Sequence, residues 1–522
     1  MSEARHLDVG PRAGELIDGP FPRARDIVTM PGVEPALARE LRSAWAGETH
    51  SFHMPAHKGG RGAPPLAHEL LGTAAFIADL SELGGFDYLH DPAGGLLEAQ
   101  QRAADVFGAD RSWFLVNGAT VGNLAAVYAT VPDGGKVLLA RGSHRSVYAG
   151  LVLAGAVPVY LPPVRNPRLD GLFGIDPADA RRALAEHPDI VAIHITSPNY
   201  YGFCVPVAEM AELAHEHGIP LIVDEAHGTH FAFHPDFPRS ALSEDADLVV
   251  HSPHKTLGSL TQSSLLHIRG GRVDAGRLAA ALQMLQSSSP SALLLVSLDL
   301  ACAAMADSGF ERWSVALDLA AEGRRRLNKI DRIEVYGTGL AGEPGIVGTD
   351  PIKLVVDVAG LGLTGFEAAA WLRAHRSLNP EFADLRRLVC SVTVADDESA
   401  VDALVDGFSA LADSVAAGRP PRPIASEWPT GVPEMVLSPR AASQDPGVAV
   451  PLGAAVDRVA TEMVMPYPPG IPLLVPGERI TTAVLDALRQ LRDSGCRLVG
   501  MSDPTGETLR CVDSVVQSRT NP

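Results

Sequence analysis

The sequence predicts an α/β protein built around a mostly parallel sheet. Between about residues 110 and 270, short runs rich in Val, Ile and Leu alternate with stretches of helical spacing. Continuous apolar runs of this kind indicate strands that helices bury on both faces. We expect seven strands, at residues 112–117, 136–140, 157–161, 190–195, 219–225, 247–251 and 263–268.

Capping residues mark the helix boundaries between these runs. Asp176 precedes Pro177, which suits a first helical turn, and Asp179 lies near the positive end of the helix dipole. This helix should end before Pro188. Further helices are expected from about Val33, from about Thr120 and over residues 207–217.

A chain of 522 residues is too long for one compact core, so two or three domains are expected. Strands at 352–358 and 388–395, with helices at 365–375 and after Asp397, predict a second unit. A final unit contains a helix from about Thr481 whose apolar face carries Val484, Leu485, Leu488 and Leu491. The predicted order is a flexible N-terminal tail and arm (1–50), a large domain (51–320), a small α+β domain (321–416), a Pro- and Gly-rich linker (417–433) and a C-terminal α/β domain (434–522).

Composition excludes several classes of protein. The net charge of −19 argues against a general nucleic-acid binder. The five cysteines are odd in number and form no CxxC pair, so neither a disulfide framework nor a metal site is expected. We see no signal-peptide pattern and no run of eighteen apolar residues, which predicts a cytoplasmic protein without a membrane partner.

Lys255 is the first candidate for chemistry. It follows the strand expected at 247–251, between the small hydroxyl residues Ser252 and Thr256, and such groups suit a phosphate. Asp224 ends an earlier strand, so both side chains can meet at the same edge of the sheet. A lysine that holds pyridoxal 5'-phosphate (PLP) as a Schiff base and an Asp that keeps the pyridine nitrogen protonated are typical of PLP enzymes. The structural alternatives are a surface lysine and a capping acid.

Two histidines extend this hypothesis. His227 comes three residues after Asp224 and can reach the cofactor's phenolic oxygen or a substrate carboxylate. His144 follows the strand expected at 136–140, where its ring can stack on the pyridine. Each could instead be a structural histidine held by hydrogen bonds.

Gly118, Ala119 and Thr120 stand between a strand and a helix start. Backbone N–H groups and the helix dipole make such a turn a phosphate site, although an ordinary turn has the same composition. The turn contains neither GxGxxG nor GxxxxGK[ST], which argues against a dinucleotide or nucleotide enzyme.

At this point the sequence resembles a known family, the Orn/Lys/Arg decarboxylases of PLP fold type I. The similarity runs from about residue 50 to about residue 515, and its last motif is similar to a signature of that family's C-terminal domain. The matching stretches are FHMPAHKGG (52–60), LSELGGFDYLHDPAGGLLEAQQRAADVFGAD (80–110), FLVNGATVGN (114–123), SHRSVYAG (143–150), TSPNYYG (196–202), VDEAHGTHFAFHP (223–235), HSPHKTLGSLTQSS (251–264), LQSSSPS (285–291), GLTGFEA (362–368) and PYPPGIPLLVPGERI (466–480).

The resemblance implies a fold and a role for each matching residue. It implies an aspartate-aminotransferase-like large domain, a smaller α+β domain and the family's additional C-terminal domain. Lys255 would be the Schiff-base lysine, Asp224 the partner of the pyridine nitrogen and His144 the stacking ring. The phosphate would be held by Ala119, Thr120, Ser252 and His254, while Ser287, Ser288 and Ser289 would reach a neighbouring subunit's cofactor. Two departures are Ala56, where the family's PGHK motif has glycine, and Ala119, where a hydroxyl residue is common.

The resemblance also implies α-decarboxylation of a cationic amino acid, with arginine ranked before lysine and ornithine, by a homodimer or a larger homo-oligomer. Lys255, His254 and His227 are all candidate proton donors, and the sequence does not choose among them. Another PLP reaction, such as transamination or elimination, and a non-catalytic regulatory homologue are the alternatives. The acids that could meet the substrate's cation are Glu82, Asp87, Glu381 and Asp79.

Overall fold

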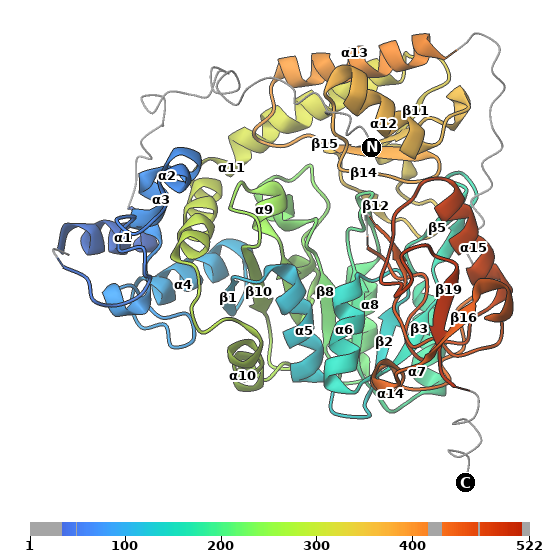
Figure 1. Ribbon diagram of the computed structural model, residues 1–522, viewed down its shortest axis with the longest axis horizontal. Helices are drawn as coiled ribbons and strands as arrows, with labels where there is room; N and C mark the ends of the chain where they lie inside the picture. Colours follow the sequence, from blue (N-terminus) through green and yellow to red (C-terminus); the bar gives the residue numbers. More distant parts are fainter. Residues whose placement is uncertain (1–33, 48–49, 416–430, 468–469, 514–522) are drawn as a thin grey trace, which may run out of the picture. The chain divides into compact units, whose positions relative to one another are not determined.

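The computed structural model describes residues 34–47, 50–415, 431–467 and 470–513 (Figure 1). The chain divides into two units, Met1–Glu34 and Pro35–Pro522, and only the second is described below. The predicted flexible tail and most of the predicted linker at 417–433 lie outside the described residues.

A seven-stranded sheet forms the centre of the large domain. In spatial order its strands are β1 (Arg111–Leu115), β10 (Ser264–Ile268), β9 (Leu248–His251), β8 (Leu221–Asp224), β6 (Ile190–Thr196), β2 (Lys136–Ala140) and β3 (Val157–Leu161). Strand β10 pairs antiparallel with both of its neighbours, and the other four pairings are parallel. The predicted mostly parallel sheet is confirmed, since all seven expected runs are its strands.

Both faces of this sheet are buried, as the continuous apolar runs predict. Leu138 belongs to the core cluster on one face and its neighbour Leu139 to the cluster on the other. The face of Leu139 packs against α5 (Gly118–Thr130), α6 (Arg145–Ala154) and α10 (Ala275–Leu285). The opposite face packs against α4 (Gly95–Phe107), α7 (Pro177–Glu186), α8 (Val207–Glu216) and α11 (Ala292–Leu327). Asp176 caps α7 as predicted, because its carboxylate accepts from the Ala178 N–H.

Helix α11 is 36 residues long and runs from the large domain into the small one, with a kink at Ser308. The predicted boundary between residues 320 and 321 therefore falls inside a helix. Among the described residues, α11 is the one helix long and apolar enough to span a membrane by length and composition. Its residues Leu295, Leu298 and Trp313 are buried in the core of this chain, as in a core helix.

The small domain contains a four-stranded antiparallel sheet with its own core. Its strands, in spatial order, are β11 (Glu334–Tyr336), β13 (Lys353–Asp357), β15 (Arg387–Ser391) and β14 (Phe382–Ala383). Two helices that the sequence predicts, α12 (Gly365–Arg376) and α13 (Glu398–Ser414), pack on this sheet. Asp397 caps α13 by accepting from the Ala400 N–H.

The C-terminal part has a third core. It consists of α14 (Pro439–Gln444), α15 (Thr482–Asp493) and two short antiparallel pairs, β16 (Val448–Pro451) with β19 (Thr508–Cys511) and β17 (Met465–Pro466) with β18 (Leu498–Val499). The four apolar residues expected on one face of α15 are all buried. The remaining elements are α1 (Ala36–Gly47), α2 (Pro65–Leu71), α3 (Thr73–Ala78), the pair β4 (Val164–Asn166) with β5 (Gly171–Phe173), and the pair β7 (Phe203–Cys204) with β12 (Gly348–Thr349).

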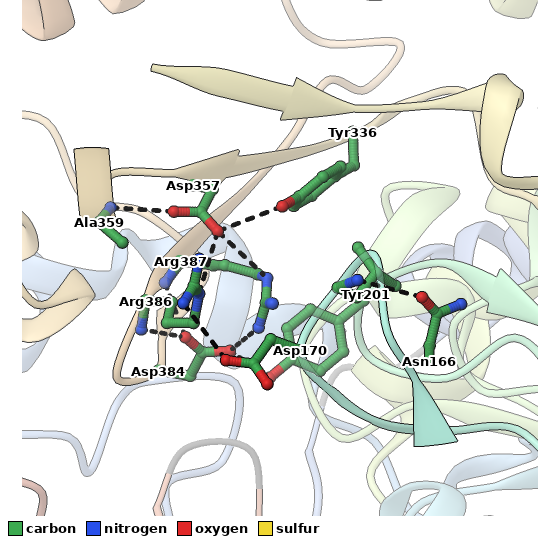
Figure 2. Close-up of polar contacts among 10 residues, drawn as sticks. Asn166, Asp170, Tyr201, Tyr336, Asp357, Ala359, Asp384, Arg386 and Arg387 are labelled. Atoms are coloured by element: carbon green, nitrogen blue, oxygen red, sulfur yellow. Dashed lines mark hydrogen bonds and ion pairs between the residues drawn. The ribbon is translucent and has the colours of Figure 1, made fainter. Parts of the chain in front are cut away.

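A polar network joins the small domain to the large one (Figure 2). The Asp384 carboxylate, in the turn between β14 and β15, accepts from the Tyr201 hydroxyl at 2.7 Å. Arg386 in the same turn lies 3.5 Å from Asp170 of the large domain. The turn is held rigid because Asp384 also accepts from the backbone N–H groups of Arg386 and Arg387.

Candidate active site

The predicted site residues lie at one edge of the seven-stranded sheet. Asp224 is the last residue of β8, and Lys255 lies in the short helix α9 (Pro253–Thr256) directly after β9. His144 caps α6 after β2, and Gly118 begins α5 after β1. These positions follow from the topology, because side chains after the carboxyl ends of parallel strands converge at one edge.

Lys255 lies next to His227 at the edge of a cavity, and its side chain is exposed to that cavity. Its Nζ lies 2.9 Å from Nε2 of His227. Desolvation by the surrounding protein, together with the nearby Lys353 cation, holds the pKa of Lys255 below its usual range, although Asp224 and Glu381 oppose this shift. A lysine with a lowered pKa supplies a neutral amine more readily, as attack on a carbonyl carbon requires.

Asp224 is buried and held in place by two donors. Its carboxylate accepts from Nδ2 of Asn123 at 2.8 Å and from the Ala226 N–H at 3.1 Å. Asn123 also donates to Ser146, which lies in the first turn of α6 beside His144. The structure thus connects Asp224 and His144 through two polar side chains.

His144 is neutral in this environment. Burial lowers its pKa to about 4, with Asp224 opposing the shift and Lys255 adding to it. Its Nδ1 accepts from the Ser146 N–H. An uncharged imidazole at this position suits stacking on an aromatic ring.

The residues of the predicted phosphate site fit PLP. Gly118 has φ +68°, a conformation that favours glycine, and begins a helix whose first N–H groups belong to Ala119 and Thr120. The buried hydroxyls of Ser252 and Thr256 have no hydrogen-bond partner within the described parts of the chain. Orphaned buried hydroxyls are costly, so they indicate a polar ligand such as a phosphate. His254 lies beside them, with Nδ1 bound to the Ser263 carbonyl oxygen at 2.6 Å.

Small-domain residues complete the site, and sequence reasoning missed two of them. The Glu381 carboxylate lies 3.6 Å from Nδ1 of His227, and it binds Lys353 and Ser391 at 2.5 Å each. A cavity of about 520 Å³ is lined by Lys255, Lys353, Glu381, Ser391 and their neighbours. Lys353 could have been found as the only charge in the apolar start of its strand, IKLVVDV.

Tyr200 is another residue for which the sequence suggested no role. Its ring centroid lies 4.9 Å from that of His227 in an edge-on arrangement and 6.5 Å from that of His144. Burial, with Asp224, Tyr467 and Glu381 nearby, raises its pKa well above the usual value. It stands four residues after β6, so the rule that ligands bind at this edge could have indicated it.

Two of the three remaining candidate acids, Asp87 and Asp79, have other partners in this chain. Asp87 caps the start of α4, since its carboxylate accepts from the N–H groups of Ala93, Gly94 and Leu96. Asp79 lies 3.1 Å from Nε2 of His57. Glu82 begins a short 3-10 helix at Glu82–Gly84. A role for Glu82 or Asp87 in a substrate pocket stays a prediction.

The serines at 287–289 lie in a surface segment. Ser288 is exposed, and the Ser287 carbonyl oxygen accepts from His90 at 2.8 Å. That contact joins this segment to the stretch 80–110. Their predicted role toward a second subunit stays a prediction.

The C-terminal domain contacts the loop that carries His144. The Arg145 N–H donates to the Gly470 carbonyl oxygen at 3.2 Å. Arg141 donates to the Pro472 carbonyl oxygen and to the Glu478 carboxylate. This domain therefore supports one wall of the site, in a segment that also belongs to the motif at 466–480.

Relatives of known name share most of this chain. The arginine decarboxylase of Halalkalibacterium halodurans is 37% identical over 461 residues, which cover 88% of this chain and 94% of the relative. That of Bacillus subtilis is 36% identical, covering 92% and 98%. The lysine decarboxylase LdcA of Pseudomonas aeruginosa is 27% identical, covering 88% and 76%.

Solved structures share the fold. The lysine decarboxylase LdcF of Francisella novicida has a TM-score of 0.79 at 22% identity, covering 92% of this chain and 81% of that chain. The Escherichia coli constitutive lysine decarboxylase has a TM-score of 0.77 at 22% identity, covering 92% and 82%. With the seven-stranded sheet and the small domain, these likenesses confirm PLP fold type I.

Two family models match the chain. The model described as "Orn/Lys/Arg decarboxylase, major domain" matches residues 35–400, and that described as "Orn/Lys/Arg decarboxylase, C-terminal domain" matches residues 424–506. The resemblance seen in the sequence is confirmed. The chain belongs to the Orn/Lys/Arg decarboxylase family.

Proposed function

We propose that this protein is a PLP-dependent decarboxylase that converts arginine to agmatine and CO2. The observation that carries the proposal is the contact between Lys255 and His227 beside a buried Asp224. The ranking of arginine above lysine and ornithine is supported by the names of the relatives at 36–37% identity.

The chain's own residues supply a holding site for the cofactor. Lys255 would hold PLP through its amine, Asp224 would face the pyridine nitrogen and His144 would cover the ring. The N–H groups of Ala119 and Thr120, with Ser252 and His254, would hold the phosphate. When bound, PLP accepts the electrons that a departing carboxylate leaves behind.

Three groups of the chain can deliver the proton that replaces the carboxylate. Lys255 and His227 are in contact, and His254 belongs to the same short helix as Lys255. The Tyr200 ring packs edge-on against His227, and small-domain residues line the cavity beside Lys255. Asp224 itself is buried, which strengthens its interaction with any positive charge nearby.

A cationic substrate side chain needs a carboxylate partner, because an unpaired buried charge is costly. Glu82, Asp87 and Glu381 are the candidates, and of these Glu381 lines the cavity beside Lys255. An Arg-selective pocket would use a bidentate contact, so an amide at the partner position should reduce arginine turnover more than lysine turnover.

The test is a substrate panel of arginine, lysine, ornithine and the neutral analogue citrulline, with CO2 and amine measured separately. We expect the highest kcat/KM for arginine. Equal turnover of citrulline would refute a cation-selective pocket, and a keto-acid product without CO2 would indicate a transaminase. A protein that gains no visible absorbance with PLP would indicate the non-catalytic alternative.

We further propose that the protein acts as a homodimer or a larger homo-oligomer, because the segment at 285–291 lies on the surface and would face a neighbour. Closed dimers are the commonest assemblies. Light scattering of the active protein at micromolar concentration tests this, and a fully active monomer would contradict it. A cytoplasmic location, without nucleic-acid or membrane partners, stays a prediction.

A further inference from the structure

The small domain places an ion pair between a buried lysine and a more exposed glutamate next to the reactive lysine. The side chain of Lys353 is only 3% exposed, and its Nζ lies 2.5 Å from Oε2 of Glu381. The Ser391 hydroxyl donates to the same oxygen. Oε2 is thus fully engaged within the small domain, while Oε1 points toward the large one.

Glu381 then meets His227 across the junction between the two domains. Its Oε1 lies 3.6 Å from Nδ1 of His227, and Nε2 on the other side of that ring lies 2.9 Å from Nζ of Lys255. Four groups therefore stand in a row, in the order Lys353, Glu381, His227 and Lys255. Along this row the positive charge of Lys353 faces the negative charge of Glu381, and the neutral ring of His227 lies between Glu381 and Lys255.

The order of charges decides where the histidine proton sits. A carboxylate facing Nδ1 favours the proton on Nδ1, because a positive N–H edge then faces a negative oxygen. Nε2 is left with a lone pair that faces Lys255. On its other side the same carboxylate lies 2.5 Å from Nζ of Lys353, which fixes the position of Glu381.

We propose that Lys353 and Glu381 are a positioning pair that orients His227 so that its Nε2 accepts the proton that Lys255 must lose. In this step one N–H bond of the Lys255 ammonium breaks and one forms at Nε2. The products are a neutral amine and a histidinium whose Nδ1–H faces Glu381. This inference rests on the proposed function only in identifying Lys255 as the reactive lysine.

Other charged groups also act on Lys255 and His227. Asp224 favours the ammonium form of Lys255. Burial holds the pKa of His227 well below its usual range, and Lys255, Lys353, His144 and His254 add to this shift. A histidinium formed at Nε2 therefore passes its proton on to solvent at the cavity rather than keeping it. The positioning pair differs from the other groups because both of its residues belong to the small domain. It also assigns Glu381 a role other than pairing with the substrate's cation.

The test measures the pKa of Lys255 in the full-length protein freed of cofactor. Acetic anhydride is small enough for the cavity, and the pH dependence of Lys255 acetylation is read by peptide mapping. Lys353→Met leaves the Glu381 anion unpaired, so the Lys255 pKa should rise by about one unit. Glu381→Gln leaves the Lys353 cation unpaired, so the Lys255 pKa should fall by about one unit. In the double variant the Lys255 pKa should return close to its value in the wild-type protein.

Two further variants complete the design. Lys136→Met removes a cation from the exposed pair with Asp189 and should leave the Lys255 pKa unchanged. In a His227→Gln background, the shift caused by Lys353→Met should shrink by at least half. Single variants that shift the pKa in the same direction, or not at all, would overturn the proposal. Shifts that are unaffected by His227→Gln would overturn the role of His227.

The reconstituted enzyme distinguishes this proposal from a substrate contact. A positioning role predicts that Glu381→Gln lowers kcat for arginine, lysine and ornithine by a similar factor and moves the pH profile. A selective rise in KM for arginine would instead identify Glu381 as the substrate's partner and overturn the proposal. Absence of decarboxylation in wild type would remove the proposed function, whereas the Lys255 titration would remain a valid test.

Discussion

Two cations follow strands of the same sheet, yet their surroundings differ, because the Arg141 side chain is only 10% exposed whereas Lys255 is exposed at a cavity. Arg141, after β2, lies 3.1 Å from the Glu478 carboxylate and donates to two carbonyl oxygens, of Pro472 and Leu473. Burial alone would lower its pKa, but Glu478 and the neighbouring tyrosines raise it above the ordinary value. Arg141 is therefore charged and well bonded, as in a structural contact between domains.

Lys255, after β9, has the opposite character. Its Nζ contacts the ring of His227, and desolvation lowers the pKa of Lys255. The hydroxyls of Ser252 and Thr256 nearby have no partner in the described chain. The comparison indicates that a buried cation with a strong anionic partner joins domains, whereas a cation that faces a cavity and has no such partner is available for chemistry.

Replacing Lys255 by alanine should give the largest effect. Without the amine, the protein should lose the visible absorbance of bound PLP and its turnover should fall by at least about 10³-fold, since both covalent attachment and proton transfer are lost. Absorbance scans and CO2 release measure this. Borohydride reduction that traps the cofactor on another lysine would contradict the assignment.

Asp224→Asn should give the next largest effect on turnover. The amide keeps the shape of the side chain but removes its charge, so PLP should still bind while kcat falls by about 10²-fold or more. Asn123 would still have an oxygen to donate to. Turnover near that of wild type would remove Asp224 from the mechanism.

Glu478→Gln should mainly change stability. It leaves the Arg141 charge buried without an anion, which should lower the free energy of unfolding by about 3 kcal/mol. Urea unfolding followed by circular dichroism measures this. Glu322→Gln, at the exposed pair with Arg325, is the matched control and should have no measurable effect. A loss no larger than the control would mean that Glu478 is protonated in the folded protein.

The sequence predicted the large sheet well because its strands are fully buried. A strand covered on both faces is a continuous apolar run, and each of the seven runs became a strand. The strands β14, β17 and β18 have two residues each, too few to show any pattern. Helix α11 was not predicted at all, and its apolar residues serve the cores of two domains.

The placement of the candidate site residues was predictable where it depends on one sheet. Lys255, Asp224 and His144 end or follow strands, and chain topology alone brings them to one edge, while their roles stay a prediction. Lys353 and Tyr200 were not found, because their contacts depend on how two domains pack. Such contacts leave no periodic pattern in the sequence, and here only a charge within an apolar strand pointed to Lys353.

Tyr201→Phe should give the smallest effect. It tests the junction between the large domain and the small domain. The Tyr201 hydroxyl donates to Asp384, whose carboxylate keeps the Arg386 and Arg387 backbone donors after the change (Figure 2). One hydrogen bond lost from a network that remains bonded should cost about 1 kcal/mol of unfolding free energy. Because Tyr201 adjoins Tyr200, kcat should also fall, by no more than about fivefold, the factor that corresponds to 1 kcal/mol. Urea unfolding and steady-state kinetics on the same preparation measure both. A stability loss equal to that of Glu478→Gln would contradict this expectation, because it would mean that one hydrogen bond holds the small domain as strongly as the buried ion pair holds the C-terminal domain.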